Sequence, residues 1–365
     1  MTLVQRSLRE LERLEEAGLR RSVPSNDGLV DFASNDYLGL AAAPPVLAAL
    51  RGAARVGSGG SRLLSGAHPE HAALERELAT FVRRERVLLF SSGYLAALGA
   101  IHGLARIASI AYSDELNHAC VIDGLRLTRI ERHVLPHGAL PPLHERPGPA
   151  VVLTESLFGM TGEQTDLGAI LASLREDDVL LVDEAHALGV FGPGGAGFAS
   201  VHDDPRIVVL GTLSKAFGCA GGFVAGPAAF IELLISTARS FIFDTSLPPP
   251  VVRAARVALE RIAGGDDLRG ALFERLAEAD ALLRPLGCSG PVRTPIVPIV
   301  VGEARRALAI AGGLRDAGLY VPAIRPPTVP AGTSRLRVTL RADHTGEQIA
   351  RLARGIAETF DPVPA

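Results

Sequence analysis

Lysine is almost absent from this sequence. Lysine and arginine together number 37 in 365 residues, and Lys215 is the single lysine, so the other 36 are arginines. A bias toward arginine codons explains the arginines, because arginine serves as well as lysine on a solvated surface. Survival of one lysine by chance is the alternative to a functional reason. Arginine cannot lose its proton in a protein, so a lysine that acts as a free amine has no arginine substitute. Lys215 is therefore the first candidate for a reactive residue.

Cysteines are few and follow no pairing pattern. The sequence has three, Cys120, Cys219 and Cys288, scattered along the chain and without a CxxC pair. This arrangement argues against a disulfide framework and against a zinc site. A reducing cytoplasm is the simplest setting for it.

Long apolar runs and a strong net charge are also missing. No run approaches the roughly 18–20 residues of a membrane span, and the N-terminal segment lacks the apolar core of a signal peptide. A formal net charge of −3 gives no overall basic field for nucleic acid. No Gly-Lys pair exists, which excludes a Walker A loop. We expect a cytoplasmic protein with no membrane and no nucleic acid as partner.

What the sequence does contain is an alternation of strand-like apolar runs with helical patterns. The expected strands are Val87–Phe90, Ile107–Tyr112, Ala150–Thr154, Val179–Val182, Ile207–Leu210 and Gly222–Ala225. Helices are expected between most of them, including Pro69–Arg84, Tyr94–Leu104 and Asp166–Leu174, and an amphipathic helix around Val4–Leu14 is expected to end near Gly18. This order predicts an α/β fold with a mostly parallel sheet covered on both faces.

The pattern changes at the proline tract Leu247–Pro250. Long helical patterns follow to about Leu286, and then two strands, Ile296–Val300 and Leu336–Leu340, and a last helix, Thr345–Phe360. The sequence therefore predicts an N-terminal arm at 1–39, a large α/β domain at 40–250 and a smaller α+β domain at 251–365.

One glycine-rich segment, Gly192–Gly197, has the GxGxxG spacing of a dinucleotide-binding loop. It does not directly follow a strand, Pro193 lies inside it, and no clear helix begins from it, all contrary to that motif. We interpret it as a surface loop. A nicotinamide oxidoreductase that uses this loop is the corresponding alternative.

Two chemically capable side chains stand at the carboxyl ends of predicted strands, where open α/β sheets bind ligands. Asp183 ends one strand and would keep a pyridine nitrogen protonated, although a helix N-cap is an equal alternative. Lys215 follows another strand, where partial burial would lower its pKa and favour a nucleophile or base. The pair on neighbouring strand ends is stronger evidence than either residue alone.

Two further segments have both a functional and a structural interpretation. Ser91–Tyr94 follows a strand and begins a helix, so its N–H groups and hydroxyls form either a phosphate cradle or a plain turn. His118 is either a core or capping histidine or a ligand contact, and its position in the sequence does not decide between them.

Taken together, several segments resemble the α-oxoamine synthases, a family of fold-type I pyridoxal-phosphate enzymes. They are Asn35–Leu40, Gly57–Arg62, Asn117–Ala119, Asp183–His186, Thr212–Lys215 and Ile324–Arg337, and the similarity covers nearly the whole chain. The resemblance implies pyridoxal 5'-phosphate as cofactor and a homodimer with shared active sites.

The resemblance also implies a role for each matching residue. Lys215 is the Schiff-base lysine and catalytic base, Asp183 pairs with the ring nitrogen, and His118 stacks on the ring. Further cofactor contacts are expected from Gly93, Tyr94, Gly159, His186, Thr212, Thr245 and Ser246, the last two on the phosphate of a neighbouring subunit. Substrate contacts are expected from Arg20, Asn35, Thr328 and Arg337, and the fork of the Arg337 guanidinium suits a carboxylate.

The segment Ile324–Arg337 is most similar to the biotin-pathway member of this family. That similarity implies condensation of L-alanine with a pimeloyl thioester, pimeloyl-CoA or pimeloyl-ACP, with loss of carbon dioxide and the free thiol. Two alternatives are a relative that uses glycine or serine with a different acyl-CoA, and an inactive regulatory protein that binds the cofactor.

The sequence departs from the family pattern at Gly159, where a serine that contacts the cofactor is usual. Thr161 replaces a usual acidic residue, and Cys120 a usual serine. Losing one neutral hydrogen bond costs on the order of 1 kcal/mol. We therefore expect weaker cofactor binding but not loss of activity.

Overall fold

The computed structural model describes residues 1–365 except 22, 24, 52–53, 144–146, 287–289 and 360–365, so Cys288 lies outside the described residues. The chain forms two compact units, one made of 35–159 and 163–270, the other of 1–34, 160–162 and 271–365. The division follows residue 270 rather than 250, because helix α9 (Pro249–Ala263) packs on α2 (Pro44–Arg51) and α3 (Pro69–Phe81) of the larger unit.

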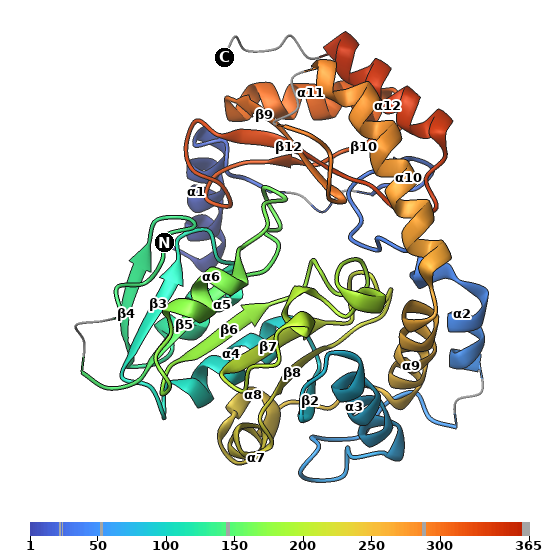
Figure 1. The fold of residues 1–365 in the computed structure, drawn as a ribbon. Helices are drawn as coiled ribbons and strands as arrows, with labels where there is room; N and C mark the ends of the chain where they lie inside the picture. Colours follow the sequence, from blue (N-terminus) through green and yellow to red (C-terminus); the bar gives the residue numbers. More distant parts are fainter. Residues whose placement is uncertain (22, 24, 52–53, 144–146, 287–289, 360–365) are drawn as a thin grey trace. The chain divides into compact units, whose positions relative to one another are not determined.

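The larger unit is built on a seven-stranded sheet of order β2-β8-β7-β6-β5-β3-β4 (Figure 1). Its strands are β2 (Arg86–Phe90), β3 (Ile110–Asp114), β4 (Glu131–Leu135), β5 (Ala150–Glu155), β6 (Val179–Asp183), β7 (Ile207–Thr212) and β8 (Gly222–Gly226). Neighbours from β7 to β4 are parallel, and only β8 runs against its two neighbours. The predicted mostly parallel sheet is confirmed.

Alternate residues of each central strand face opposite layers of helices. Val151 and Leu153 of β5 belong to a core with α4 (Gly93–Leu104), α5 (Ala119–Arg126), α7 (Ala228–Thr237) and α8 (Arg239–Ile242). Val152 and Thr154, on the other face, border a cavity beside α6 (Leu167–Ser173). Coverage on both faces explains why these strands are apolar along their whole length.

The strand β4 was not predicted from the sequence. Its residues, Glu-Arg-His-Val-Leu, are mostly exposed, and it pairs with β3 at one edge of the sheet. An exposed edge strand needs no apolar run, so hydrophobic patterning does not identify it.

The glycine-rich segment forms no dinucleotide-binding loop. It contains the short 3-10 helix Pro193–Gly195, and another, Phe198–Val201, follows it. Its second half is buried around the Glu184 carboxylate, which accepts hydrogen bonds from the Phe198 and Ala199 N–H groups. The expected surface loop is therefore only half exposed, because it encloses a buried acid.

The smaller unit contains a three-stranded antiparallel sheet of order β11-β12-β9 and a parallel pair of β1 with β10. Its elements are α1 (Leu3–Glu16), β1 (Val30–Asp31), β9 (Ile296–Gly302), α11 (Ala304–Asp316), β10 (Leu319–Tyr320), β11 (Ala323–Ile324), β12 (Ser334–Thr339) and α12 (Gly346–Thr359), with α10 (Asp266–Leu283) leading into it. A capping box between Thr2 and Gln5 begins α1, none of whose residues is buried.

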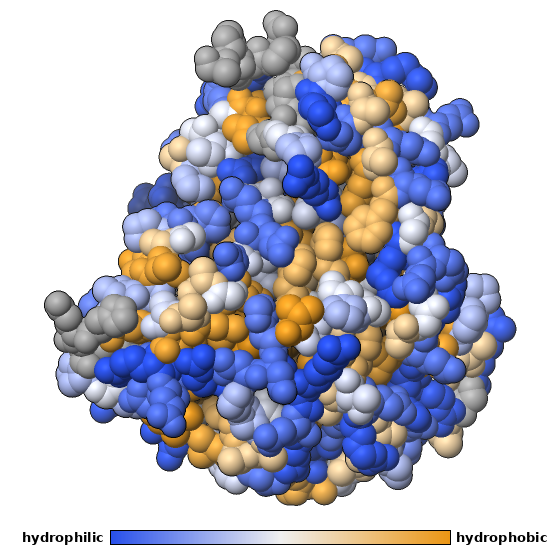
Figure 2. Space-filling view, viewed as in Figure 1, coloured by the Kyte–Doolittle hydropathy of each residue, from blue (hydrophilic) through white to orange (hydrophobic). Residues whose placement is uncertain are grey.

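The described residues include no helix long and apolar enough to cross a membrane. On the face drawn in Figure 2, hydrophilic side chains are widespread and apolar patches lie between them.

Candidate active site

The cavity around Lys215 lies at the carboxyl ends of the parallel strands. β6 ends at Asp183, and its neighbour β7 leads through a short turn to Lys215. The cavity has a volume of about 260 Å³ and is lined by Ser92, Gly93, Tyr94, His118, Cys120, Glu155, Asp183, Ala185, His186, Leu210, Gly211, Thr212, Ser214 and Lys215. Seven of the residues expected to contact the cofactor thus lie together: Gly93, Tyr94, His118, Asp183, His186, Thr212 and Lys215.

A chain of polar contacts runs from the lysine into the interior. Lys215 Nζ lies 2.9 Å from His186 Nε2, and His186 Nδ1 lies 2.6 Å from the hydroxyl of the fully buried Tyr37. The same hydroxyl is 3.3 Å from Asn35 Oδ1. Asn35 was predicted as a substrate contact, whereas Tyr37 was not singled out although it belongs to the same motif.

His118 is the N-cap of α5 and faces the cavity. Its Nδ1 accepts a hydrogen bond from the Cys120 N–H at 3.2 Å and lies 3.0 Å from Cys120 Sγ. Burial lowers the pKa of His118, the Asp183 charge opposes that effect and the Lys215 charge adds to it. A neutral imidazole suits stacking on a ring, and the capping interpretation also applies.

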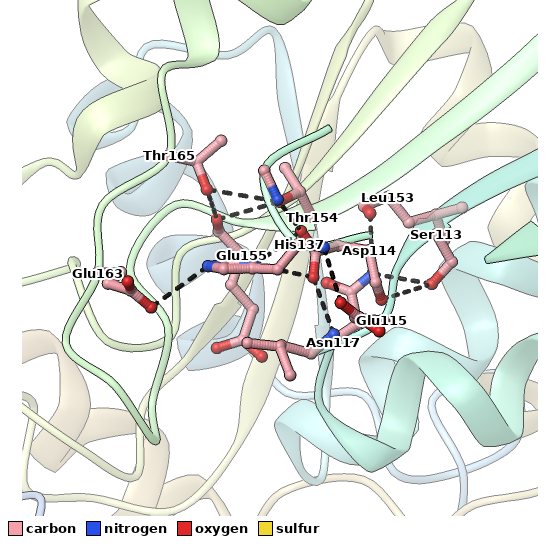
Figure 3. A network of polar contacts seen from close by, with 12 residues as sticks. Ser113, Asp114, Glu115, Asn117, His137, Leu153, Thr154, Glu155, Glu163 and Thr165 are labelled. Carbon is pink, nitrogen blue, oxygen red and sulfur yellow. Dashed lines mark hydrogen bonds and ion pairs between the residues drawn. The ribbon is translucent and has the colours of Figure 1, made fainter. Parts of the chain in front are cut away.

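Asn117 holds this histidine segment against the sheet. Its Nδ2 donates to Ser113 Oγ at 2.9 Å and to the Leu153 carbonyl at 2.8 Å (Figure 3). These bonds join the start of α5 to β3 and β5 next to the cavity. The position of His118 therefore depends on two strands as well as on its own helix.

Figure 3 also shows a second group of contacts, centred on His137 and Asp114. His137 Nδ1 lies 2.9 Å from one carboxylate oxygen of Asp114, and its Nε2 lies 3.3 Å from Glu163 Oε2. Asp114 also accepts from the Leu116 and Gly138 N–H groups, so its oxygens serve the backbone at the end of β3. This group supports the strand ends and does not line the cavity.

Glu155 is a cavity residue that the sequence analysis missed. It is the last residue of β5, 5% exposed, and one oxygen accepts from the Gly159 N–H at 3.1 Å. Burial and, to a smaller extent, the nearby Asp183 charge raise the pKa of Glu155 to about 8. The Glu155 carboxyl group is therefore largely protonated at neutral pH. Asp183 ends the neighbouring strand, β6. Its position in the sequence could have identified Glu155, because it directly follows a predicted strand, just as Asp183 does.

The start of α4 also lines the cavity. Ser92 is its N-cap and accepts from the Leu95 N–H, and a Cβ at Gly93 would lie 3.3 Å from the Thr212 side chain. The glycine thus lets the helix begin close to β7. The hydroxyls of Thr212 and Ser214 lie 2.8 Å apart and add hydrogen-bond donors beside the backbone N–H groups at the start of α4. A helix N-terminus with neighbouring hydroxyls suits a phosphate.

Gly159 lies outside the residues that line the cavity but contacts its wall. A Cβ at this position would overlap the His186 ring, lying 2.9 Å from Cδ2 and closer still to Nε2. The glycine therefore leaves the space in which His186 reaches Lys215.

The other predicted residues lie elsewhere. Thr245 is exposed, and Ser246 is buried and donates to the Gly66 carbonyl at 2.6 Å; neither lines the cavity. In the smaller unit, Thr328 accepts from Arg21, while Arg20 pairs with Glu15 on the surface. Arg337 is also in that unit, 4% exposed in β12, and donates to Thr339 Oγ1 at 3.0 Å.

The cavity has the groups that pyridoxal phosphate requires. Lys215 supplies an amine for the aldehyde, Asp183 a carboxylate for the ring nitrogen, and His118 a flat ring beside them. The N-terminus of α4 with Thr212 and Ser214 supplies phosphate donors.

Comparison with known proteins agrees with this arrangement. The family model Aminotransferase class I and II matches residues 27–356. The 8-amino-7-oxononanoate synthase of Anaeromyxobacter dehalogenans is 43% identical over 97% of this chain and 95% of its own, and that of Azoarcus sp. is 41% identical over 96% of both. A serine palmitoyltransferase from S. paucimobilis, solved with bound pyridoxal phosphate and myriocin, has a TM-score of 0.88, 27% identity and 98% coverage of both chains. The chain therefore belongs to the 8-amino-7-oxononanoate synthases, a family of pyridoxal-phosphate-dependent acyltransferases of fold type I.

Proposed function

We propose that this enzyme condenses L-alanine with a pimeloyl thioester to give 8-amino-7-oxononanoate. In the overall reaction the alanine α-carbon bonds to the thioester carbonyl carbon, the thiol leaves, and the alanine carboxylate departs as carbon dioxide. The observation that carries the proposal is the convergence of Lys215, Asp183 and His118 on one cavity in a chain of this family. The acyl donor is pimeloyl-CoA or pimeloyl-ACP.

Pyridoxal phosphate, when bound, supplies an aldehyde that takes up amines and a ring that withdraws electrons. Lys215 would hold the cofactor through Nζ in the resting enzyme, and its free amine would accept the α-proton of alanine at Nζ. The Asp183 carboxylate would stabilise a positive charge on the ring nitrogen, and His118 would orient the ring. The N-terminus of α4 binds the phosphate. The cavity would bind the two reactants beside Lys215, so part of the rate would come from their positioning.

The substrate contacts come, in this proposal, from Arg20, Asn35, Thr328 and Arg337. Asn35 is already linked to the lysine through Tyr37 and His186. Arg337 offers a planar fork of donors that matches the alanine carboxylate. Its replacement by lysine keeps the charge and is expected to raise the KM for alanine more than it lowers kcat.

We also propose a homodimer whose subunits share active sites. Leu64 and Phe243 are 83% and 71% exposed, in two loops that Ser246 joins by hydrogen bonds to the Gly60 and Gly66 carbonyls. Exposed apolar side chains of this size support an interface there. Thr245, two residues after Phe243, is exposed, as the proposed contact with a neighbouring subunit's phosphate requires.

The dimer is tested by introducing a charge into that surface. Leu64→Asp is expected to shift sedimentation toward the monomer and to weaken cofactor retention. The same change at Leu127, which is 73% exposed at the end of α5, is the control. A Leu64→Asp protein that sediments like the unmodified chain contradicts the proposed interface.

The reaction is tested with purified holoenzyme, alanine and pimeloyl-CoA or pimeloyl-ACP. Thiol release and a product with the mass of 8-amino-7-oxononanoate are expected. Glycine and serine with shorter and longer acyl-CoA donors are the comparison. Thiol release from one of those pairs, without release from alanine and either pimeloyl donor, overturns the assignment.

A further inference from the structure

We propose that the larger unit has a second ligand site, which takes a small molecule with an apolar body and an ammonium group. The site is the cavity beside α6, which has a volume of about 420 Å³ and is called the second cavity below. It lies near the ends of β3 and β5, and none of the described residues lines both this cavity and the one around Lys215. Its size is typical of small-molecule sites, and the inference does not depend on the proposed function.

A buried tyrosine hydroxyl without a partner belongs to the second cavity. Tyr112 of β3 is 5% exposed and lines the cavity, and its ring centroid lies 5.5 Å from that of His133 on β4. Within the described part of the chain, the Tyr112 hydroxyl makes no hydrogen bond. Buried hydroxyls in proteins are normally hydrogen-bonded, so this one indicates a partner from outside the chain.

Other polar groups of the second cavity offer acceptors rather than donors. The hydroxyls of Thr154 and Thr165 lie 3.5 Å apart, and both donate to the Glu155 carbonyl, at 3.3 Å and 2.6 Å (Figure 3). Because their protons are used in these bonds, their oxygens can only accept from a ligand. Asp166, which is exposed, uses its Oδ1 to accept from the Ala169 N–H and has a second carboxylate oxygen. These acceptors favour a ligand with an N–H donor.

The charges of the second cavity favour a cation. Its described lining residues include two carboxylates, Asp114 and Asp166, and neither lysine nor arginine. His137 also lines the cavity, 2.9 Å from Asp114 and 3.3 Å from Glu163 (Figure 3). Two carboxylates less one protonated histidine leave the lining with a net negative charge even when His137 is protonated. A positively charged ligand is therefore attracted and an anion repelled.

Much of the remaining wall of the second cavity is apolar. Val152 of β5 and Ile170 of α6 are buried, and Leu140, also part of the lining, is 52% exposed. Transfer of a hydrocarbon chain from water to such a wall is favourable. The ligand class therefore combines an apolar body, which contacts these side chains, with an ammonium group, which the hydroxyls and carboxylates bind.

The test measures binding of a simple ammonium probe to the holoenzyme by titration calorimetry. The probe is N,N-dimethylhexylamine, a tertiary amine that is protonated at neutral pH and cannot form an imine with the cofactor. Hexanoate and hexanol, which carry a negative charge and no charge on a similar chain, are the comparison. The amine is expected to bind more tightly than both, and its affinity is expected to fall as the salt concentration rises, because salt screens exposed charges.

Two conservative variants locate the bound amine. Asp166→Asn removes the charge but keeps a side chain that caps α6, because asparagine is as good an N-cap as aspartate. Tyr112→Phe removes only the unpaired hydroxyl. Each variant is expected to weaken binding of the amine by about two- to fivefold, the range for one hydrogen bond or one exposed ion pair.

Two matched controls remove the same groups elsewhere. Asp203→Asn and Tyr320→Phe lie at positions that line neither cavity, and both are expected to bind the amine as the unmodified chain does. If Tyr112→Phe does not fold, Asp166→Asn makes the test alone, since Asp166 is exposed. Absence of amine binding, equal binding of hexanoate, or an amine affinity unchanged in the folded variants overturns the inference.

Discussion

Replacing Asn117 tests how the fold positions the ring-stacking histidine. Asn117→Ala removes two hydrogen bonds, at 2.9 Å and 2.8 Å, and leaves the Leu153 carbonyl buried without that donor. Two neutral bonds are worth about 1 kcal/mol each, and an unpaired buried carbonyl adds about 1–2 kcal/mol. We expect the free energy of unfolding to fall by about 3–4 kcal/mol in urea denaturation followed by circular dichroism.

Asn117→Asp sharpens the same test. The carboxylate matches the amide in shape but cannot donate, and it would face the Leu153 carbonyl in a site that is 4% exposed. Its destabilisation is expected to exceed that of alanine, because a buried charge is added to the lost bonds. Asn26→Ala, which removes one exposed bond to Asp31, is the control and is expected to cost less than about 1 kcal/mol.

The cofactor gives a second measurement. Since His118 follows Asn117 directly, both variants are expected to release pyridoxal phosphate more readily, as measured by visible absorption during dialysis. Asn117→Ala and Asn117→Asp proteins as stable as Asn26→Ala would refute the energetic reasoning. Destabilised variants with unchanged cofactor retention would refute the link to His118.

Three other outcomes are expected. Borohydride reduction of the holoenzyme should attach the cofactor to the peptide containing Lys215, and Lys215→Arg should abolish both the label and the condensation; a label at the N-terminus contradicts this. Burial raises the pKa of Glu184 from 4.5 to about 7 and that of Glu155 to about 8. The unfolded chain releases these protons at lower pH than the folded protein does, so the free energy of unfolding should fall as the pH rises from about 4.5 to 8. Glu184 alone should contribute about 3 kcal/mol to this fall. Glu184→Gln should therefore make the urea midpoint depend less on pH. Gly211→Ala should destabilise the fold in thermal unfolding, since its Cβ would overlap the Phe223 ring; an unchanged midpoint would contradict the close packing.

Hydrophobic patterning determined most of the larger unit. Six of its seven strands were expected, because strands covered on both faces are apolar throughout and stand out from the amphipathic helices. The edge strand β4 was not predicted, because its residues are mostly exposed and need not be apolar. The last helix was expected from its amphipathic spacing, and α12 lies within the predicted range.

The sequence alone also identified the two candidate reactive residues. One lysine among 36 arginines and a carboxylate at a strand end identified Lys215 and Asp183, because strand ends are where parallel sheets bind ligands. The approach of His186 and Tyr37 to the lysine, from positions 29 and 178 residues before it, depends on the fold, as does the burial that keeps Glu155 protonated. Sequence determines which groups are present and which strand they follow, but hydrogen-bond partners and solvent exclusion arise only when distant segments pack together.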